Sequence, residues 1–268
     1  MKKFLRLHTC FLICFALTGL TFCLRSAALL FAFDREIGYF ANGALPVLFN
    51  VIAALSLLFF ALTAFCLPAK ELGEPAPQKS AALRAAAGAV ALLLVADLIL
   101  LFTTGQYQRA KSFLIVLTVP ALLLACAYFL TIALGKTLRG SAMALPGCGG
   151  IFAGALLISL LYFDRYTPMN APRKVGVQLA LLSFMLALLY ELRAKTGIPL
   201  PRMAVFSTLL SFFLCVVIGL SDIVAFAAGV YRVPFYFMQD LLLLASGIYF
   251  LLSGPRPLGQ KTGKDQTT

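Results

Sequence analysis

Long apolar segments alternate with short polar ones along the whole chain. A helix needs about 20 apolar residues to cross the roughly 30 Å hydrocarbon core of a bilayer, because each residue rises about 1.5 Å. Eight stretches meet this requirement: 9–33, 44–67, 83–104, 113–135, 147–163, 175–192, 203–229 and 235–253. The pattern therefore predicts an all-α integral membrane protein with eight transmembrane helices.

The composition favours the same class of protein. Hydrophobic residues make up 62% of the chain and charged residues 12%, whereas a soluble domain is about half apolar and a quarter charged. The start of the chain resembles a signal peptide, but the apolar run continues past Arg25 to Phe33, so we expect it to remain as the first helix. The seven cysteines lack metal-ligand spacing and are interpreted as packing residues.

The basic residues predict the orientation. Eight spans place both termini on the same side of the membrane. If that side is the cytoplasm, the inner segments hold fourteen Lys and Arg residues and the outer segments hold seven. The positive-inside rule therefore favours cytoplasmic N- and C-termini. The net charge of +12 then reflects topology and attraction to anionic lipid headgroups, and it does not indicate nucleic-acid binding.

Several short motifs occur twice in the same order, which predicts an internal duplication. The matching pairs are Phe-Asp-Arg at 33–35 and 163–165, Gly-x-Pro-x-Pro at 73–77 and 197–201, an intramembrane aspartate followed by Gly-x-Tyr at 105–107 and 229–231, and Tyr-Phe-Leu at 128–130 and 249–251. We infer two four-helix halves in a 4+4 arrangement. Because four is an even number, both halves enter the membrane in the same direction.

This duplication defines the predicted organisation of the chain. Residues 1–135 form the first half, 136–146 a cytoplasmic linker, 147–253 the second half and 254–268 a disordered basic tail. A glycine-rich stretch at the start of the fifth span, from Gly147 to Gly154, is expected to let neighbouring helices approach closely.

Charged residues inside the spans are the candidate functional residues, because a charge at mid-membrane costs about 2.5–3.5 kcal/mol on insertion scales. Arg25, Asp97, Asp222 and Asp240 all fall about 5–9 Å from the span centres toward the outer face. Three uncharged polar residues, Asn50, Gln178 and Gln239, fall in the same half. We therefore predict one outward-facing polar cluster that binds a small solute or an ion.

Arg25 is the one cation near these three aspartates, and it has no counterpart in the second half. Nearly equal depth favours Arg25 with Asp97 as the first pairing and Arg25 with Asp222 as the second. A neutral carboxylate beside one ion pair would be a candidate proton or cation relay. The alternative is that the buried charges only hold the helices together.

A second set of charged residues flanks the outer ends of the spans. The basic members of this set could receive an anionic solute or a lipid headgroup. The favoured interpretation is a solvated and mainly structural rim. Its members are Asp34, Arg35, Asp164, Arg165, Arg173 and Lys174.

Catalytic signatures are missing from the sequence. The only histidine is His8, and no HExxH, GxSxG, P-loop or Cys/His ligand pattern occurs. We therefore expect a protein that is not an enzyme and that uses no cofactor and no metal.

The segment TPMNAPRK at 167–174, followed by QLALLSFMLALLYELR at 178–193, resembles a motif in a family of uncharacterised multi-pass membrane proteins of Clostridia-like Gram-positive bacteria. The resemblance is strongest over residues 161–193. It implies a bacterial cytoplasmic membrane location, and no activity is known for the family, so it transfers no site residue.

Two functions remain from the sequence. The first is a permease-like or solute- or ion-binding protein with its polar cluster between the two halves, as internal duplications are common in transporters. The second is a non-transporting accessory or sensory bundle that acts through a protein partner. A hydrated cavity between the halves would favour the first function, whereas a dry core with Arg25 fully paired would favour the second.

Overall fold

The computed structural model describes residues 7–34, 38–41, 43–67, 80–103, 112–136, 141–163, 171–197, 200–230 and 234–254. Within these residues the chain forms eight helices: α1 (Leu7–Phe31), α2 (Ala44–Cys66), α3 (Ala81–Thr103), α4 (Ser112–Ala133), α5 (Ser141–Phe163), α6 (Pro172–Lys195), α7 (Pro201–Ala227) and α8 (Pro234–Ser253). Each helix is long and apolar enough to cross a membrane. The predicted all-α integral membrane fold is thereby confirmed.

The helix boundaries agree with the apolar runs except at α5. This helix begins at Ser141, so that the second part of the predicted linker 136–146 is helical. Pro146 lies inside α5, and Pro120 lies inside α4. Prolines are tolerated in transmembrane helices where neighbouring helices support the backbone, and α5 packs against both α4 and α6.

The first Phe-Asp-Arg motif forms a small β-hairpin between α1 and α2. Strand β1 (Phe33–Asp34) pairs antiparallel with β2 (Tyr39–Phe40). Gly38, with φ of 78°, adopts the left-handed conformation that the turn requires. The corner predicted at this motif is therefore a hairpin. Its counterpart at 164–165 lies outside the described residues.

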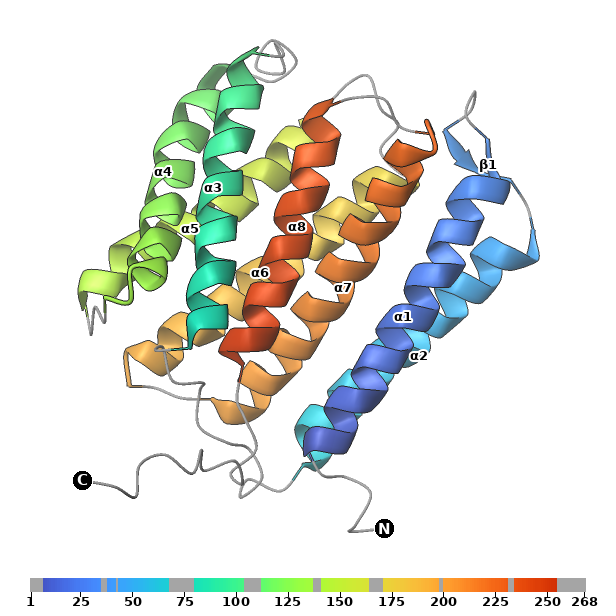
Figure 1. Ribbon diagram of the computed structural model, residues 1–268, viewed down its shortest axis with the longest axis horizontal. Helices are drawn as coiled ribbons and strands as arrows, with labels where there is room; N and C mark the ends of the chain where they lie inside the picture. Colours follow the sequence, from blue (N-terminus) through green and yellow to red (C-terminus); the bar gives the residue numbers. More distant parts are fainter. Residues whose placement is uncertain are drawn as a thin grey trace.

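Helices α3 to α8 form a closed ring, in which each helix packs against the next and α8 packs against α3 (Figure 1). Helices α1 and α2 pack against each other and against α7, on the outside of this ring. The described packing is thus two helices beside six. It does not confirm two compact four-helix halves, because α1 and α2 pack mainly with α7.

The glycine-rich stretch of α5 allows close packing within the ring. A Cβ atom added at Gly150 would lie 2.7 Å from Leu188 of α6, and one added at Gly149 would overlap the side chain of Leu124 on α4. Similar overlaps would occur at Gly147 and Gly154. The sequence prediction that these glycines serve helix packing is confirmed.

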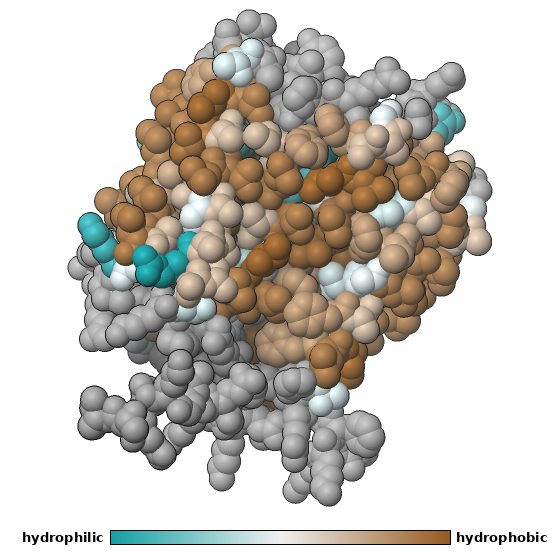
Figure 2. Space-filling view, in the orientation of Figure 1, coloured by the Kyte–Doolittle hydropathy of each residue, from teal (hydrophilic) through white to brown (hydrophobic). Residues whose placement is uncertain are grey.

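The outer surface of the bundle is apolar. Figure 2 shows hydrophobic side chains across most of the coloured area of the visible face. Helix α2 is the least buried of the eight candidate spans, and it exposes Val47, Val51, Leu55 and Leu62 among others. Such a surface is stable only in contact with apolar surroundings, so these side chains face the lipid bilayer.

Candidate functional site

A buried ion pair joins α1 to α7. The Nη2 atom of Arg25 lies 2.8 Å from Oδ1 of Asp222, and the Nε of Arg25 donates a hydrogen bond of 2.7 Å to the Ser221 hydroxyl. The exposed fraction of these side chains is 2% for Arg25 and 0% for Asp222. Pairing offsets part of the cost of holding both charges away from water.

A second buried pair joins α6 to α8. The Nη2 atom of Arg173 donates hydrogen bonds to Oδ1 of Asp240 at 2.8 Å and to the backbone carbonyl of Tyr236 at 3.0 Å. The guanidinium also lies 4.0 Å from the centre of the Tyr236 ring, a favourable cation–π distance. This pair is also buried, with 7% of the Arg173 side chain and 1% of the Asp240 side chain exposed.

Asp222 connects the two pairs. Its Oδ2 atom lies 3.9 Å from the Nε of Arg173, so that Arg25, Asp222, Arg173 and Asp240 form one continuous series of opposite charges. We call these four residues the outer ion-pair chain. Its two cations and two anions cancel, and they come from α1, α7, α6 and α8.

Three members of the outer ion-pair chain lie at a common depth in the bundle. Arg25 is six residues before the end of α1 at Phe31, Asp222 is five before the end of α7, and Asp240 is six after the start of α8. With a rise of about 1.5 Å per residue, each lies about 7.5–9 Å inside the same end of the bundle. We refer to this end as outer and to the opposite one as inner, following the predicted orientation.

Two glycines create the space for the outer ion-pair chain. A Cβ atom added at Gly219 of α7 would lie 2.6 Å from the backbone oxygen of Asp240, so this glycine lets α7 and α8 approach at the level of the site. A Cβ atom at Gly176 of α6 would lie 3.3 Å from Nη2 of Arg25. Gly219 therefore brings two backbones together at this level, and Gly176 leaves room for the Arg25 guanidinium.

The predicted pairing of Arg25 with Asp97 is wrong, and the second choice, Arg25 with Asp222, is confirmed. Asp97 is 1% exposed on α3, and its Oδ1 atom has no hydrogen-bond partner among the described residues. Helix α1 packs on α7, whereas α3 packs on α4 and α8. Equal depth gave no information on which helices are neighbours.

The outer rim was also predicted incorrectly in part. Arg173 and Lys174 are only 6% and 3% exposed, so they are buried rather than solvated. Asp34 is half-buried in β1. Arg35, Asp164 and Arg165 lie outside the described residues.

The uncharged polar residues of the predicted cluster have different environments. Gln239 is buried on α8 beside Asp240, and its Oε1 atom has no hydrogen-bond partner in the described part of the chain. Gln178 is half-buried on α6, and Asn50 is exposed on α2. The structure therefore brings Arg25, Asp222 and Asp240 together and leaves Asn50 on the surface.

A second polar site, which the sequence analysis did not identify, lies at the inner end of the ring. The Oε1 atom of Glu191 accepts hydrogen bonds from the Tyr128 hydroxyl at 2.9 Å, the Tyr249 hydroxyl at 2.6 Å and Nζ of Lys195 at 2.6 Å. Lys195 also donates to the Tyr128 hydroxyl at 2.8 Å. We call these four residues the inner cluster. Two signals pointed to it: the repeated Tyr-Phe-Leu motif and the four-residue spacing of the Glu–Lys pair.

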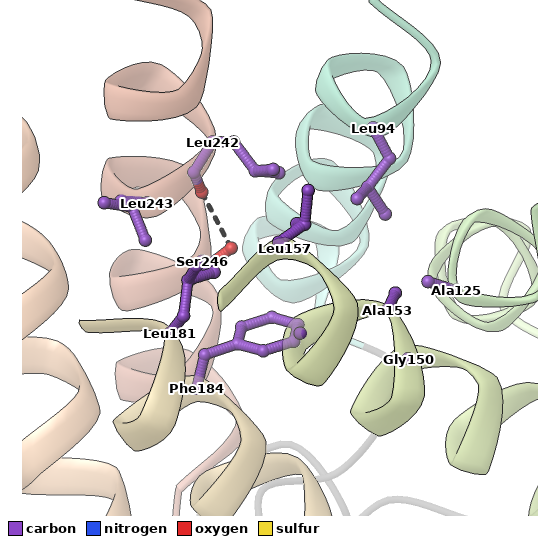
Figure 3. A pocket seen from close by; sticks show the side chains of 11 residues that line it. Leu94, Ala125, Gly150, Ala153, Leu157, Leu181, Phe184, Leu242, Leu243 and Ser246 are labelled. Carbon is purple, nitrogen blue, oxygen red and sulfur yellow. Dashed lines mark hydrogen bonds between the residues drawn. The ribbon is translucent and has the colours of Figure 1, made fainter. Parts of the chain in front are cut away.

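A small apolar cavity lies between these two polar sites along the helices. On α8, Leu242, Leu243 and Ser246 line the cavity, and they follow Asp240 and precede Tyr249. Figure 3 shows side chains converging on this space from α3, α5, α6 and α8. Its volume of about 20 Å³ is enough for about one water molecule. The Ser246 hydroxyl is already bonded to the Leu242 carbonyl, so the cavity offers little to hold a polar ligand.

Comparisons of the chain with protein-family models, curated proteins and solved structures found no match. The functional argument therefore depends on the geometry of this chain alone.

Proposed function

We propose that the chain is a permease-like membrane protein that binds a small cation, a proton or a solute with hydrogen-bond donors at the outer ion-pair chain. One observation carries the proposal: four charged side chains from four helices lie within the bundle as one connected series. Ionisable residues inside a membrane are rare and costly, and they commonly mark ion or substrate pathways.

Unsatisfied acceptors near the same level indicate the chemistry of the ligand. Oδ1 of Asp97, Oδ2 of Asp222 and Oε1 of Gln239 are buried and accept no hydrogen bond from the described residues. They lie on α3, α7 and α8, and α8 packs against both of the other helices. A buried acceptor without a donor costs free energy, which a bound cation, a proton or a donor group would recover.

The non-transporting bundle remains the second candidate, because a different observation favours it. Arg25 has two bonded partners, and the described cavity at the centre of the ring is small and apolar. A buried ion-pair network can hold helices in one arrangement without binding any ligand. In that case the charges would fix the position of α1 and α2 against the ring.

Ligand-dependent thermal stability of the purified, reconstituted protein separates the two functions. Wild type, Asp97→Asn and the control Asn50→Ala are screened against cations, a pH series and a library of small solutes. The proposal expects at least one condition to raise the melting temperature of wild type and of the control. Asp97→Asn should need at least about ten times more ligand for the same shift, because one acceptor loses its charge.

Two results would contradict the binding function. One is that no condition stabilises wild type. The other is that Asp97→Asn responds at the same ligand concentrations as wild type and Asn50→Ala. Either result would favour the non-transporting bundle, for which Asp97 is only a buried structural residue.

A further inference from the structure

The inner cluster spans the centre of the ring. Its residues come from α4, α6 and α8, which are alternate members of the ring, so their side chains reach across the interior. Both tyrosines are completely buried. The cluster therefore links three alternate helices at the inner end of the ring.

An aromatic layer lies directly beside the cluster. The aromatic ring centroid of Phe129 on α4 lies 5.0 Å from that of Tyr249 on α8 and 6.2 Å from that of Phe184 on α6. Phe184 also contacts Phe250 on α8, at 5.5 Å. Phe184 also lines the cavity, so this layer reaches the cavity through one of its rings. Along α4, α6 and α8, the cluster residues follow Ala125, Phe184 and Ser246 of the cavity lining, so the cluster lies on the inner side of the cavity.

The ion pair of the cluster lies at the boundary with solvent. The exposed fraction is 15% for Lys195 and 13% for Glu191, in contrast to the fully buried tyrosines. Three donors converge on Oε1 of Glu191, while its Oε2 atom accepts no hydrogen bond from the described residues. The two tyrosines are thus held by a single carboxylate oxygen, whose charge is balanced by one partly exposed lysine.

We propose that the inner cluster is an inner gate, which keeps the cavity closed toward the inner face until Lys195 and the tyrosines release Glu191. This inference depends on the proposed function, because a gate has a role only if a ligand moves between the two faces. The outer ion-pair chain lies toward the opposite end of the same bundle. Opening at the inner end requires three contacts to one oxygen atom to break together.

A purely structural role makes a different prediction. If the cluster only tied α4, α6 and α8 together, its loss would lower stability without opening the cavity to one side in particular. The accessibility of the cavity from each face therefore distinguishes a gate from a structural tie.

The test uses Ser246→Cys as a reporter, because Ser246 lines the cavity and is 1% exposed. The exposed and half-exposed cysteines, Cys23, Cys66, Cys126 and Cys148, are replaced by serine, and the chain without the reporter gives the background of the buried ones. A charged, membrane-impermeant methanethiosulfonate is applied to either face of sided vesicles. Lys136→Cys, exposed at the end of α4, identifies the inner face.

Labelling of the reporter is compared in Glu191→Gln, Tyr249→Phe and the control Arg84→Gln. Arg84 is exposed at the same end of the ring, and among the described residues its one hydrogen bond goes to the backbone oxygen of Ala133, at 3.0 Å. Glu191→Gln should raise the labelling rate from the inner face by at least about tenfold, since the closed state loses its charge-assisted bonds. Tyr249→Phe should give a smaller increase, and the control none. Labelling from the outer face should stay unchanged.

The gate is rejected if both cluster variants are labelled at the wild-type rate, or if labelling rises equally from both faces, which indicates general loosening. Tyr249→Phe loses one hydrogen bond and keeps the ring, so it tests the proposal even if Glu191→Gln does not fold. The labelling measurement uses no ligand. Its result can therefore contradict the inner gate while the ligand screen supports the proposed function, or the reverse.

Discussion

Breaking the Arg25–Asp222 pair tests the outer ion-pair chain most directly. Removal of one partner of a buried pair typically costs about 3–5 kcal/mol, because the other charge stays buried without compensation. Arg25→Met should fall at the lower end, since Asp222 keeps Arg173 at 3.9 Å. Asp222→Leu should cost more, because Arg25 is then left with the Ser221 hydroxyl alone as its hydrogen-bond partner among the described residues.

The double variant Arg25→Met, Asp222→Leu removes both charges and replaces them with apolar groups of similar size. Replacement of a buried ion pair in this way is often neutral or stabilising. We therefore expect the double variant to lie within about 2 kcal/mol of wild type, far from the roughly 6–10 kcal/mol that the two single losses would give if they added.

The free energy of unfolding is measured in mixed micelles at increasing mole fractions of sodium dodecyl sulfate. Near-ultraviolet circular dichroism follows the transition, because the chain has nine tyrosines and no tryptophan. Asn50→Leu, on the exposed face of α2, is the control and should leave the transition unchanged. The reasoning is refuted if each single variant lies within about 0.5 kcal/mol of wild type, or if the double variant shows the sum of the two losses.

Three further substitutions test the packing and the site. Gly219→Ala should destabilise the protein by about 1–3 kcal/mol, because the new methyl group would lie 2.6 Å from the Asp240 backbone oxygen; a wild-type transition in the same micelle assay would contradict the close contact of α7 and α8. Gly88→Ala is its matched control and should be neutral or stabilising, since the nearest atom, on Ala133, would be 3.7 Å away. Asp97→Asn should stabilise the ligand-free protein by about 1–2 kcal/mol, because a buried carboxylate with an unpartnered oxygen is replaced by a neutral amide. A loss of stability would contradict this expectation and would indicate a partner for Asp97.

The sequence predicted the helices well and their neighbours poorly. Apolar length determines whether a segment can cross a membrane, so all eight helices were expected, with the main error at the start of α5. Partner choice depends on which face of each helix carries small residues, and in an apolar chain most faces look alike. Repeated motifs suggested four helices beside four, whereas the described contacts place α1 and α2 beside a ring of six.

For the candidate site, the sequence predicted how deep the charged residues lie in the membrane, but not which neighbouring helix each one faces. Counting residues along each helix gave the common level of Arg25, Asp222 and Asp240, but it could not give their direction around the helix axis. Arg173 was assigned to the solvated rim because cations at the start of a span normally face water. Here the first turn of α6 lies inside the bundle, where Asp240 and the Tyr236 ring receive the guanidinium.

The position of α1 outside the ring has a consequence for biosynthesis. Arg25 and its partner Asp222 are separated by 197 positions in the chain. At a translation rate of about 5–20 residues per second, the arginine waits about 10–40 s after its own synthesis before its aspartate exists. During that interval the charge of Arg25 must be stabilised in another way. The arginine side chain can reach the lipid headgroups, or helices α1 and α2 can stay beside the insertion machinery. Arg25 therefore gains its buried partner only after the seventh helix has been made.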